Sequence, residues 1–116
     1  MKTIYKKYVS CNGREVNNLR VELYYDLGGM NYFTSKVERR GYYLSVTPVS
    51  VSRSSYYTSE QSTAFSGIKV LLREADRQSK KAENIASIIA ETREADLIDY
   101  VCRSHSITIL SEEKGA

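Results

Sequence analysis

Cys102 and His105 come nearest to a catalytic pair in type and spacing, because a thiol nucleophile needs a base beside it. Residues three apart share one face of a helix, so these two side chains would be neighbours. The sequence offers neither a third group to orient the histidine nor a recognisable oxyanion arrangement. We therefore interpret His105 as a residue at the end of a helix and not as a catalytic base.

The other residues that could do chemistry are carboxylates and a pair of glycines. Glu94, Asp96 and Asp99 lie in a charged helical run, which is typical of a solvated helix face. Gly28-Gly29 indicates a turn and not a phosphate-binding loop, because no helix start follows it directly. No cluster of residues has metal-ligand spacing. We expect no enzyme, no catalytic residue, no metal site and no cofactor.

Aromatic and basic residues alternate in the stretch NYFTSKVERRGYYLSVTP, residues 31–48, and these types suit binding better than catalysis. A tyrosine ring stacks on any nucleobase, and a guanidinium reaches a phosphate. Tyrosine is also a preferred strand residue for packing reasons alone, so an ordinary half-buried sheet stays an alternative. The candidate nucleic-acid-binding residues are Arg20, Tyr24, Lys36, Arg39, Arg40, Tyr43, Arg73 and Arg77.

The composition of the 116 residues is that of one soluble domain. Ten tyrosines and no tryptophan supply most of the aromatic mass, which suits surfaces that are both apolar and wet. Neither a membrane span of about 20 apolar residues nor a signal peptide is visible. Cys11 and Cys102 have no redox or metal spacing. We expect a reduced, cytoplasmic protein without a membrane partner.

The charge of the chain divides near its middle. Residues 1–57 hold nine Lys/Arg and four Asp/Glu, a net charge of +5. Residues 58–116 hold eight and ten, a net charge of −2. A basic half favours an acidic partner, with nucleic acid as the first candidate, although many domains carry an excess of this size without such a partner.

Residues 1–57 show the two-residue alternation of strands. Residues 3–10 lead to Asn12-Gly13, a strong hairpin signal, and residues 19–26 return with Leu19 and Leu23 on one face. Residues 30–38 and 42–51 complete a predicted four-stranded antiparallel meander. Tyr25 and Tyr42 are in phase with the leucines and belong to its core, whereas Tyr24 and Tyr43 point outward. Pro48 should disturb strand pairing or lie on an edge.

Residues 58–105 are predicted to be a polar connection followed by a long helical region, and 106–116 a short strand or tail. A helix over residues 62–105 would span roughly 66 Å at about 1.5 Å per residue, whereas a domain of this size has a radius of gyration of about 13 Å. The helix must therefore break, with Thr92 as the candidate, or pair with a second copy. Apolar or small residues recur at steps of four and three, at Ile68, Leu72, Ala75, Ser79, Ala82, Ala86 and Ile89. The predicted dimer interface comprises Ala75, Ser79, Ala82 and Ala86.

Basic residues lie opposite this stripe, at Lys69, Arg73, Arg77, Lys80 and Lys81. Such a helix face is usually only solvated, and the alternative is a ridge that contacts phosphates.

Four strands with a curved basic face, followed by one long helix, resemble the positive-cofactor-four family of single-stranded DNA-binding proteins and its bacterial relatives. The resemblance lies in element order and charge placement over residues 1–90. The resemblance implies that single-stranded nucleic acid binds on the sheet and that the protein dimerises through its helices. The helical region here is longer and its distal part acidic, which departs from the family beyond residue 90.

The segments NYFTSKVERRGYYLSVTPV and AFSGIK are similar to small uncharacterised proteins of phages and mobile elements of gut bacteria. Small proteins of mobile elements often act by binding a host protein, and anti-CRISPR inhibitors are one example. This second resemblance implies that the partner is a host protein and not nucleic acid.

The sequence thus predicts a non-enzymatic α+β domain of the ββββα type that forms a homodimer and binds single-stranded nucleic acid on its basic strand face. The alternative is an inhibitor or adaptor that binds a host protein, in which the same tyrosines form the contact patch. The two differ in salt dependence, because phosphate binding weakens steeply as salt rises.

Overall fold

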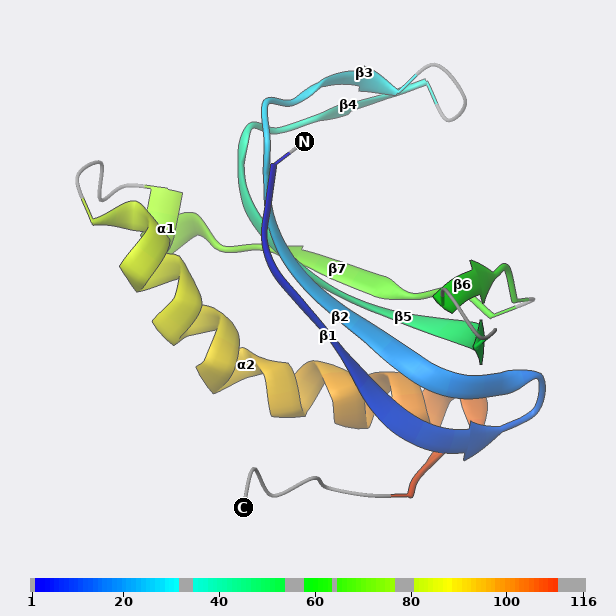
Figure 1. Cartoon of the computed structure of the whole chain (residues 1–116). Coiled ribbons are helices and arrows are strands. Elements are labelled where there is room, and N and C mark those ends of the chain that lie inside the picture. The colour runs from blue at the N-terminus through cyan, green and yellow to red at the C-terminus, as the bar shows by residue number, and fades with distance from the viewer. Residues whose placement is uncertain (1, 32–34, 54–57, 64, 77–80, 111–116) are drawn as a thin grey trace.

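A computed structural model describes residues 2–31, 35–53, 58–63, 65–76 and 81–110. The fold is α+β, with an antiparallel sheet and one main helix near the C-terminal end (Figure 1). The strands are β1 (Lys2–Gly13), β2 (Val16–Asp26), β3 (Gly29–Asn31), β4 (Lys36–Glu38), β5 (Gly41–Arg53), β6 (Thr58–Gln61), β7 (Ile68–Leu71) and β8 (Thr108–Ile109), and the helices are α1 (Arg73–Asp76) and α2 (Ala82–His105).

Within the described residues the main sheet has six strands, so the expected count of four is wrong. Its order is β6-β5-β2-β1-β8, and β7 also pairs with β5. β7 pairs with residues 43–46 of β5 and β6 with residues 50–53, on the side of β5 that β2 leaves free. Pro48 lies between these two ladders. Its ring nitrogen has no hydrogen to donate, and the expected disturbance of pairing is confirmed there.

The expected third strand, 30–38, is instead two short strands, β3 and β4, that pair with each other and form a separate two-stranded sheet. We call this β3–β4 hairpin the arm. It continues from one end of the curved main sheet (Figure 1). Gly28, at the base of the arm, has φ of +79°, and a Cβ there would lie 2.8 Å from the backbone of Glu38 and Arg40. Only glycine fits this close return of the chain.

The helical region also differs from the expectation. Residues 68–71 form β7 and not a helix, because the β-branched side chains of Ile68 and Val70 suit a strand that packs on the core. The expected break at Thr92 is wrong. α2 runs through this position, where the Thr92 hydroxyl donates to the Ile88 carbonyl at 2.9 Å. Among the described residues, α1 ends at Asp76 and α2 begins at Ala82.

The end of the chain follows the expectation of a short last strand. α2 ends at Ser106, which has φ of +53° and donates its N–H to the Cys102 carbonyl. This left-handed residue turns the chain so that β8 pairs with β1. The last strand predicted in residues 106–116 is confirmed at Thr108–Ile109.

The core lies between α2 and one face of β1, β2 and β5. Leu19, Leu23 and Leu44 are fully buried, and Ala86 and Ala90 of α2 belong to the same cluster. Small side chains on the helix allow its axis to approach the sheet closely. Burial of each leucine contributes about 1.5–3 kcal/mol to folding. In the described part of the chain no helix is both long enough and apolar enough to span a bilayer.

Candidate nucleic-acid interface

The candidate site lies on the face of the main sheet opposite α2, which we call the open face. The strands curve so that α2 packs on the outer side of the bend and the open face lies on the inner side (Figure 1). Side chains alternate across the sheet, and the register therefore places the partners of one face side by side. The open face includes Lys6, Tyr8, Arg20, Glu22, Tyr24, Tyr43, Ser45, Thr47 and Lys69.

Tyr24 and Tyr43 are direct partners on the open face, and their rings stack with centroids 5.6 Å apart and planes at 16°. They are only 7% and 6% exposed. The Tyr43 hydroxyl donates to the Arg39 carbonyl at 2.6 Å, and the Lys69 ammonium lies 5.3 Å from the Tyr43 ring centroid. Both tyrosines point away from the helix, as expected, but neither offers an exposed ring on which a base could stack.

Two cations of the open face have carboxylate partners. Arg20 Nη1 lies 2.5 Å from Glu60 Oε2, and Lys69 Nζ lies 2.6 Å from Glu38 Oε1. The hydrogen bond to Glu38 raises the pKa of Lys69, which keeps the ammonium protonated. These pairs largely cancel the positive charge that Arg20 and Lys69 would otherwise give to the face.

Lys36, Arg39, Arg40 and Arg73, on or near the arm, are exposed and form no ion pair within the described residues. We call these four cations the basic cluster. Lys6, Arg14 and Lys81 are also exposed and without an ion pair there, but they belong to β1, to the turn after β1 and to the residue before α2. Lys36 lies on β4, and Arg39 and Arg40 join the arm to β5. Arg73 follows β7 directly, where the Leu72 N–H donates to the Tyr42 carbonyl at 2.8 Å. This bond places Arg73 and Arg40 at the same end of the β5–β7 pair.

The remaining candidates do not join this cluster. Arg20 lies further along β2, opposite Thr47. Arg77 and Ser79 lie outside the described residues. The expected basic helix face is wrong, because Lys69 belongs to β7 and Arg73 to α1.

The predicted dimer seam is divided among several elements. Ala75 lies in α1, and Ala82 and Ala86 lie in α2; Ile68, which belongs to the longer apolar stripe but not to the predicted seam, lies in β7. Ala75 and Ala86 are completely buried in the chain's own core, and Ala82 is half-buried. The side chains of Ala75 and Ala86 are therefore not exposed to a second copy.

Cys102 and His105 have separate environments. Cys102 is buried, and burial raises the pKa of its thiol, so little reactive thiolate forms at neutral pH. His105 Nε2 lies 2.9 Å from the Ser66 carbonyl oxygen, and its ring centroid is 5.0 Å from that of Phe65. Cys102 and His105 therefore make packing and polar contacts near the end of α2.

Glu94 was expected on a solvated face but is 9% exposed between α2 and β1. Its Oε1 lies 2.5 Å from Lys7 Nζ, and Tyr5 donates to Oε2 at 3.5 Å. Burial, with the nearby charge of Glu94, raises the pKa of Tyr5 to about 12. One feature of the sequence indicates this contact: the two-residue alternation of β1 places Lys7 on the face of the sheet that packs against α2.

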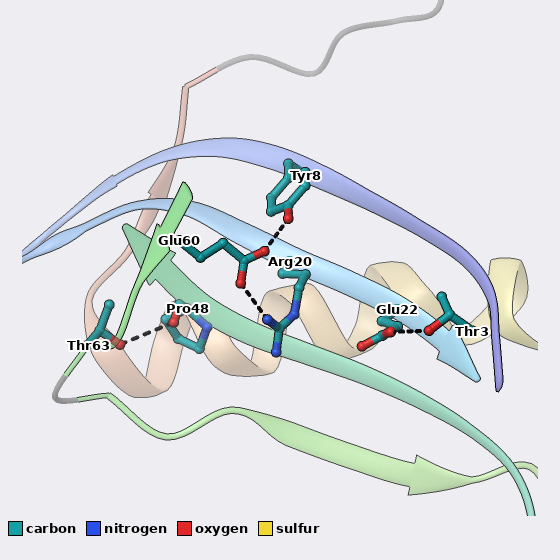
Figure 2. Close-up of polar contacts among 7 residues, drawn as sticks. All are labelled: Thr3, Tyr8, Arg20, Glu22, Pro48, Glu60 and Thr63. Atoms are coloured by element: carbon teal, nitrogen blue, oxygen red, sulfur yellow. Dashed lines mark hydrogen bonds and ion pairs between the residues drawn. The ribbon is translucent and has the colours of Figure 1, made fainter. Parts of the chain in front are cut away.

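Sequence reasoning missed the polar network around Glu60, shown in Figure 2. The Tyr8 hydroxyl donates to Glu60 Oε1, and Arg20 pairs with Oε2. Burial alone would raise the pKa of Glu60, but the hydrogen bond from Tyr8 and the charge of Arg20 outweigh it and lower this pKa. Glu60 lies in a stretch that reads as a polar connection, and nothing in its pattern indicates a strand.

Within the described ranges no group of three or more His, Cys, Asp or Glu residues is placed to hold a metal ion. Comparisons with known protein families, curated proteins and solved structures find no match to this chain.

Proposed function

We propose that the protein binds single-stranded nucleic acid without catalysing a reaction, and that the basic cluster contacts the phosphates. The observation that carries this proposal is the gathering of Arg39, Arg40 and Arg73, exposed and without ion pairs within the described residues, where the arm joins the sheet. Lys36 lies further out on the arm, opposite Asn31. A cation with no carboxylate partner keeps its full attraction for phosphate, and binding releases the counterions condensed on the strand. Three of the four cations are arginines, whose guanidinium can bind phosphate oxygens in pairs.

The bases of a bound strand would lie over the open face. Tyr8 replaces Tyr24 and Tyr43 as the candidate stacking ring, because it is 41% exposed and its hydroxyl is held by Glu60. A ring held in place loses little conformational freedom when a base stacks on it, and such stacking contributes about 1–3 kcal/mol per base. A duplex would keep its bases inside, so an exposed ring on the open face favours the single strand.

A protein partner is the second candidate, and apolar residues of the arm favour it. Leu27, Met30 and Val37 are 73%, 58% and 74% exposed at or next to β3 and β4. Apolar side chains on a projecting hairpin suit insertion into a groove of another protein. In that case the protein acts as an inhibitor or adaptor, and the partner covers the arm. A second copy of the chain, if it binds, would have to use such exposed residues and not Ala75 or Ala86.

The proposal is tested by fluorescence anisotropy with a labelled single-stranded oligonucleotide. We expect Arg39→Ala with Arg40→Ala to weaken binding, because two phosphate contacts are lost. The matched control is Arg93→Ala with Arg103→Ala, which removes the same charge from α2. Its exposed ion pairs with Glu74 and Asp99 contribute only about 0–1 kcal/mol to stability each.

Equal binding by the two double variants would contradict a specific role for the basic cluster. If the wild-type chain binds no oligonucleotide, while Val37→Glu abolishes capture of a protein partner, the second candidate replaces the first.

A further inference from the structure

A hollow of about 360 Å³ opens beside the Glu60 network, between β5, β6 and the segment that leads to β7. Its walls are mainly polar, with Arg20, Thr47, Glu60, Gln61, Ser62 and Thr63. Pro48, Val49 and Phe65 form the apolar part. This volume is near the small end of the range for small-molecule sites. In Figure 2 the Arg20 side chain reaches from β2 over β5, with Glu60 and Pro48 beside it.

Arg20 has hydrogen-bonding capacity that the chain does not use. One of its terminal nitrogens, Nη1, pairs with Glu60, whereas Nε is buried and has no hydrogen-bond partner in the part of the chain that the structure describes. A buried donor left unpaired is unfavourable. Because the buried Nε has almost no accessible surface, a ligand in the hollow would bond to the terminal nitrogens of the guanidinium and not to Nε.

Glu60 supplies the complementary function. Each of its carboxylate oxygens accepts one bond, from Tyr8 or Arg20, and each has a second lone pair available. The negative charge of Glu60 balances that of Arg20, so a phosphate entering the hollow would be repelled as much as attracted. A neutral ligand that presents both acceptors and donors fits this pair better.

The other walls favour a flat, weakly polar ring. Pro48 and Val49 are buried residues of β5, and Phe65 adds an aromatic ring that packs against the core. The lining is mostly polar, and these three residues form its apolar part, against which one face of a flat ring can pack. Neutrality, flatness and adjacent donors and acceptors together describe a nucleobase.

We propose that this hollow accepts one unpaired nucleobase and prefers guanine. Guanine O6 accepts from the Arg20 guanidinium, while its N1–H and N2–H donate together to the Glu60 carboxylate. The other bases present only one donor position next to their acceptors, so guanine alone can meet the carboxylate with two donors. The choice of a nucleobase rests on the proposed function, and it adds a base preference to the phosphate and stacking contacts proposed there, which do not distinguish the bases.

The test is a titration with guanosine, adenosine, cytidine and uridine, followed by backbone amide chemical shifts. We expect guanosine to shift the amides of Thr47, Val49 and residues 60–63 most strongly. Glu60→Gln should weaken guanosine binding about tenfold or more, because the bidentate contact is lost. The matched control is Glu22→Gln, which removes a carboxylate on β2 that is bonded to Thr3 and does not line the hollow.

Arg20→Lys is a second variant that keeps the charge opposite Glu60 but removes the planar fork, and it should also weaken guanosine binding. Thermal melts of each variant establish that the chain is folded. Equal shifts with all four nucleosides, or unchanged guanosine affinity in both folded variants, would overturn the proposal.

A second arm separates this inference from the proposed function. Oligonucleotides with and without a single guanine are compared at one salt concentration. Salt-sensitive binding of both with equal affinity would overturn the base preference and leave the proposed function standing. Selective guanosine binding without any oligonucleotide binding would retain the hollow as a nucleoside site and refute the proposed function.

Discussion

Tyr24 and Tyr43 stabilise the fold and do not offer rings for binding, because both side chains are buried on the open face. Their stacked rings are almost completely covered, and burial raises the pKa of Tyr24. The bond from the Tyr43 hydroxyl to the Arg39 carbonyl also attaches the base of the arm to the sheet. The aromatic pair therefore holds the backbone that carries two members of the basic cluster.

Tyr43→Ala should lower the free energy of unfolding by about 3–5 kcal/mol, as truncation of other large buried aromatic residues does. Tyr43→Phe keeps the ring and removes only one hydrogen bond, so it should cost about 1 kcal/mol. Chemical denaturation of the two variants measures both values. A loss below 1 kcal/mol for Tyr43→Ala would show that the stacked pair does not stabilise the sheet.

Glu60 predicts a pH dependence of stability. Because its pKa in the folded chain is below the ordinary value of 4.5, its contribution is fully present above pH 4.5 and is lost as the pH falls through the folded pKa. The stability difference between wild type and Glu60→Gln should therefore shrink below pH 4.5. Denaturation at a series of pH values measures it. A difference that grows on acidification would contradict the account of the network.

At the level of elements, Ser106 at the end of α2 forms a capping hydrogen bond but has an unfavourable backbone conformation. Ser106 adopts the left-handed conformation in which its N–H caps the helix, but a side chain makes this conformation costly. β8 and its pairing with β1 depend on this turn.

Ser106→Gly should raise the free energy of unfolding by about 0.5–1 kcal/mol, because glycine adopts positive φ without strain. Ala95→Gly, at an exposed position inside α2, is the matched control and should lower it by about 1 kcal/mol. Thermal melts distinguish the signs. Destabilisation by both glycines would mean that Ser106 is not strained.

The sequence predicted the elements that local patterns define. The alternation of Leu19 and Leu23 predicted β2 and its buried face correctly, and a hairpin between β1 and β2 is present. Its turn lies at Arg14-Glu15 and not at the predicted Asn12-Gly13, which belongs to β1. Residues 68–71 were misassigned because four apolar or basic residues satisfy a strand and a helix equally well. β6 has a polar sequence, and only its pairing with β5 makes it a strand.

At the scale of the whole molecule, the net charge of the first half predicted a basic region but not its location. Arg20 and Lys69 are neutralised by Glu60 and Glu38, which lie 40 and 31 residues away along the chain. No local pattern reveals such pairs, because they depend on which strands become neighbours. The members of the basic cluster come together only through the arm and the β5–β7 pairing.

The account therefore depends on whether the basic cluster binds phosphates. If its four cations each neutralise one phosphate of a single strand, log K should fall with log salt with a slope of about −3. The Arg39→Ala and Arg40→Ala double variant should reduce the steepness by about 1.4, and the Arg93→Ala and Arg103→Ala control should leave it unchanged.

The most direct measurement is the affinity of the wild-type chain for a labelled single-stranded oligonucleotide at several salt concentrations. We expect binding that weakens steeply as salt rises, with the slope given above. Absence of binding at micromolar protein, or an affinity that does not change with salt, would contradict the central claim.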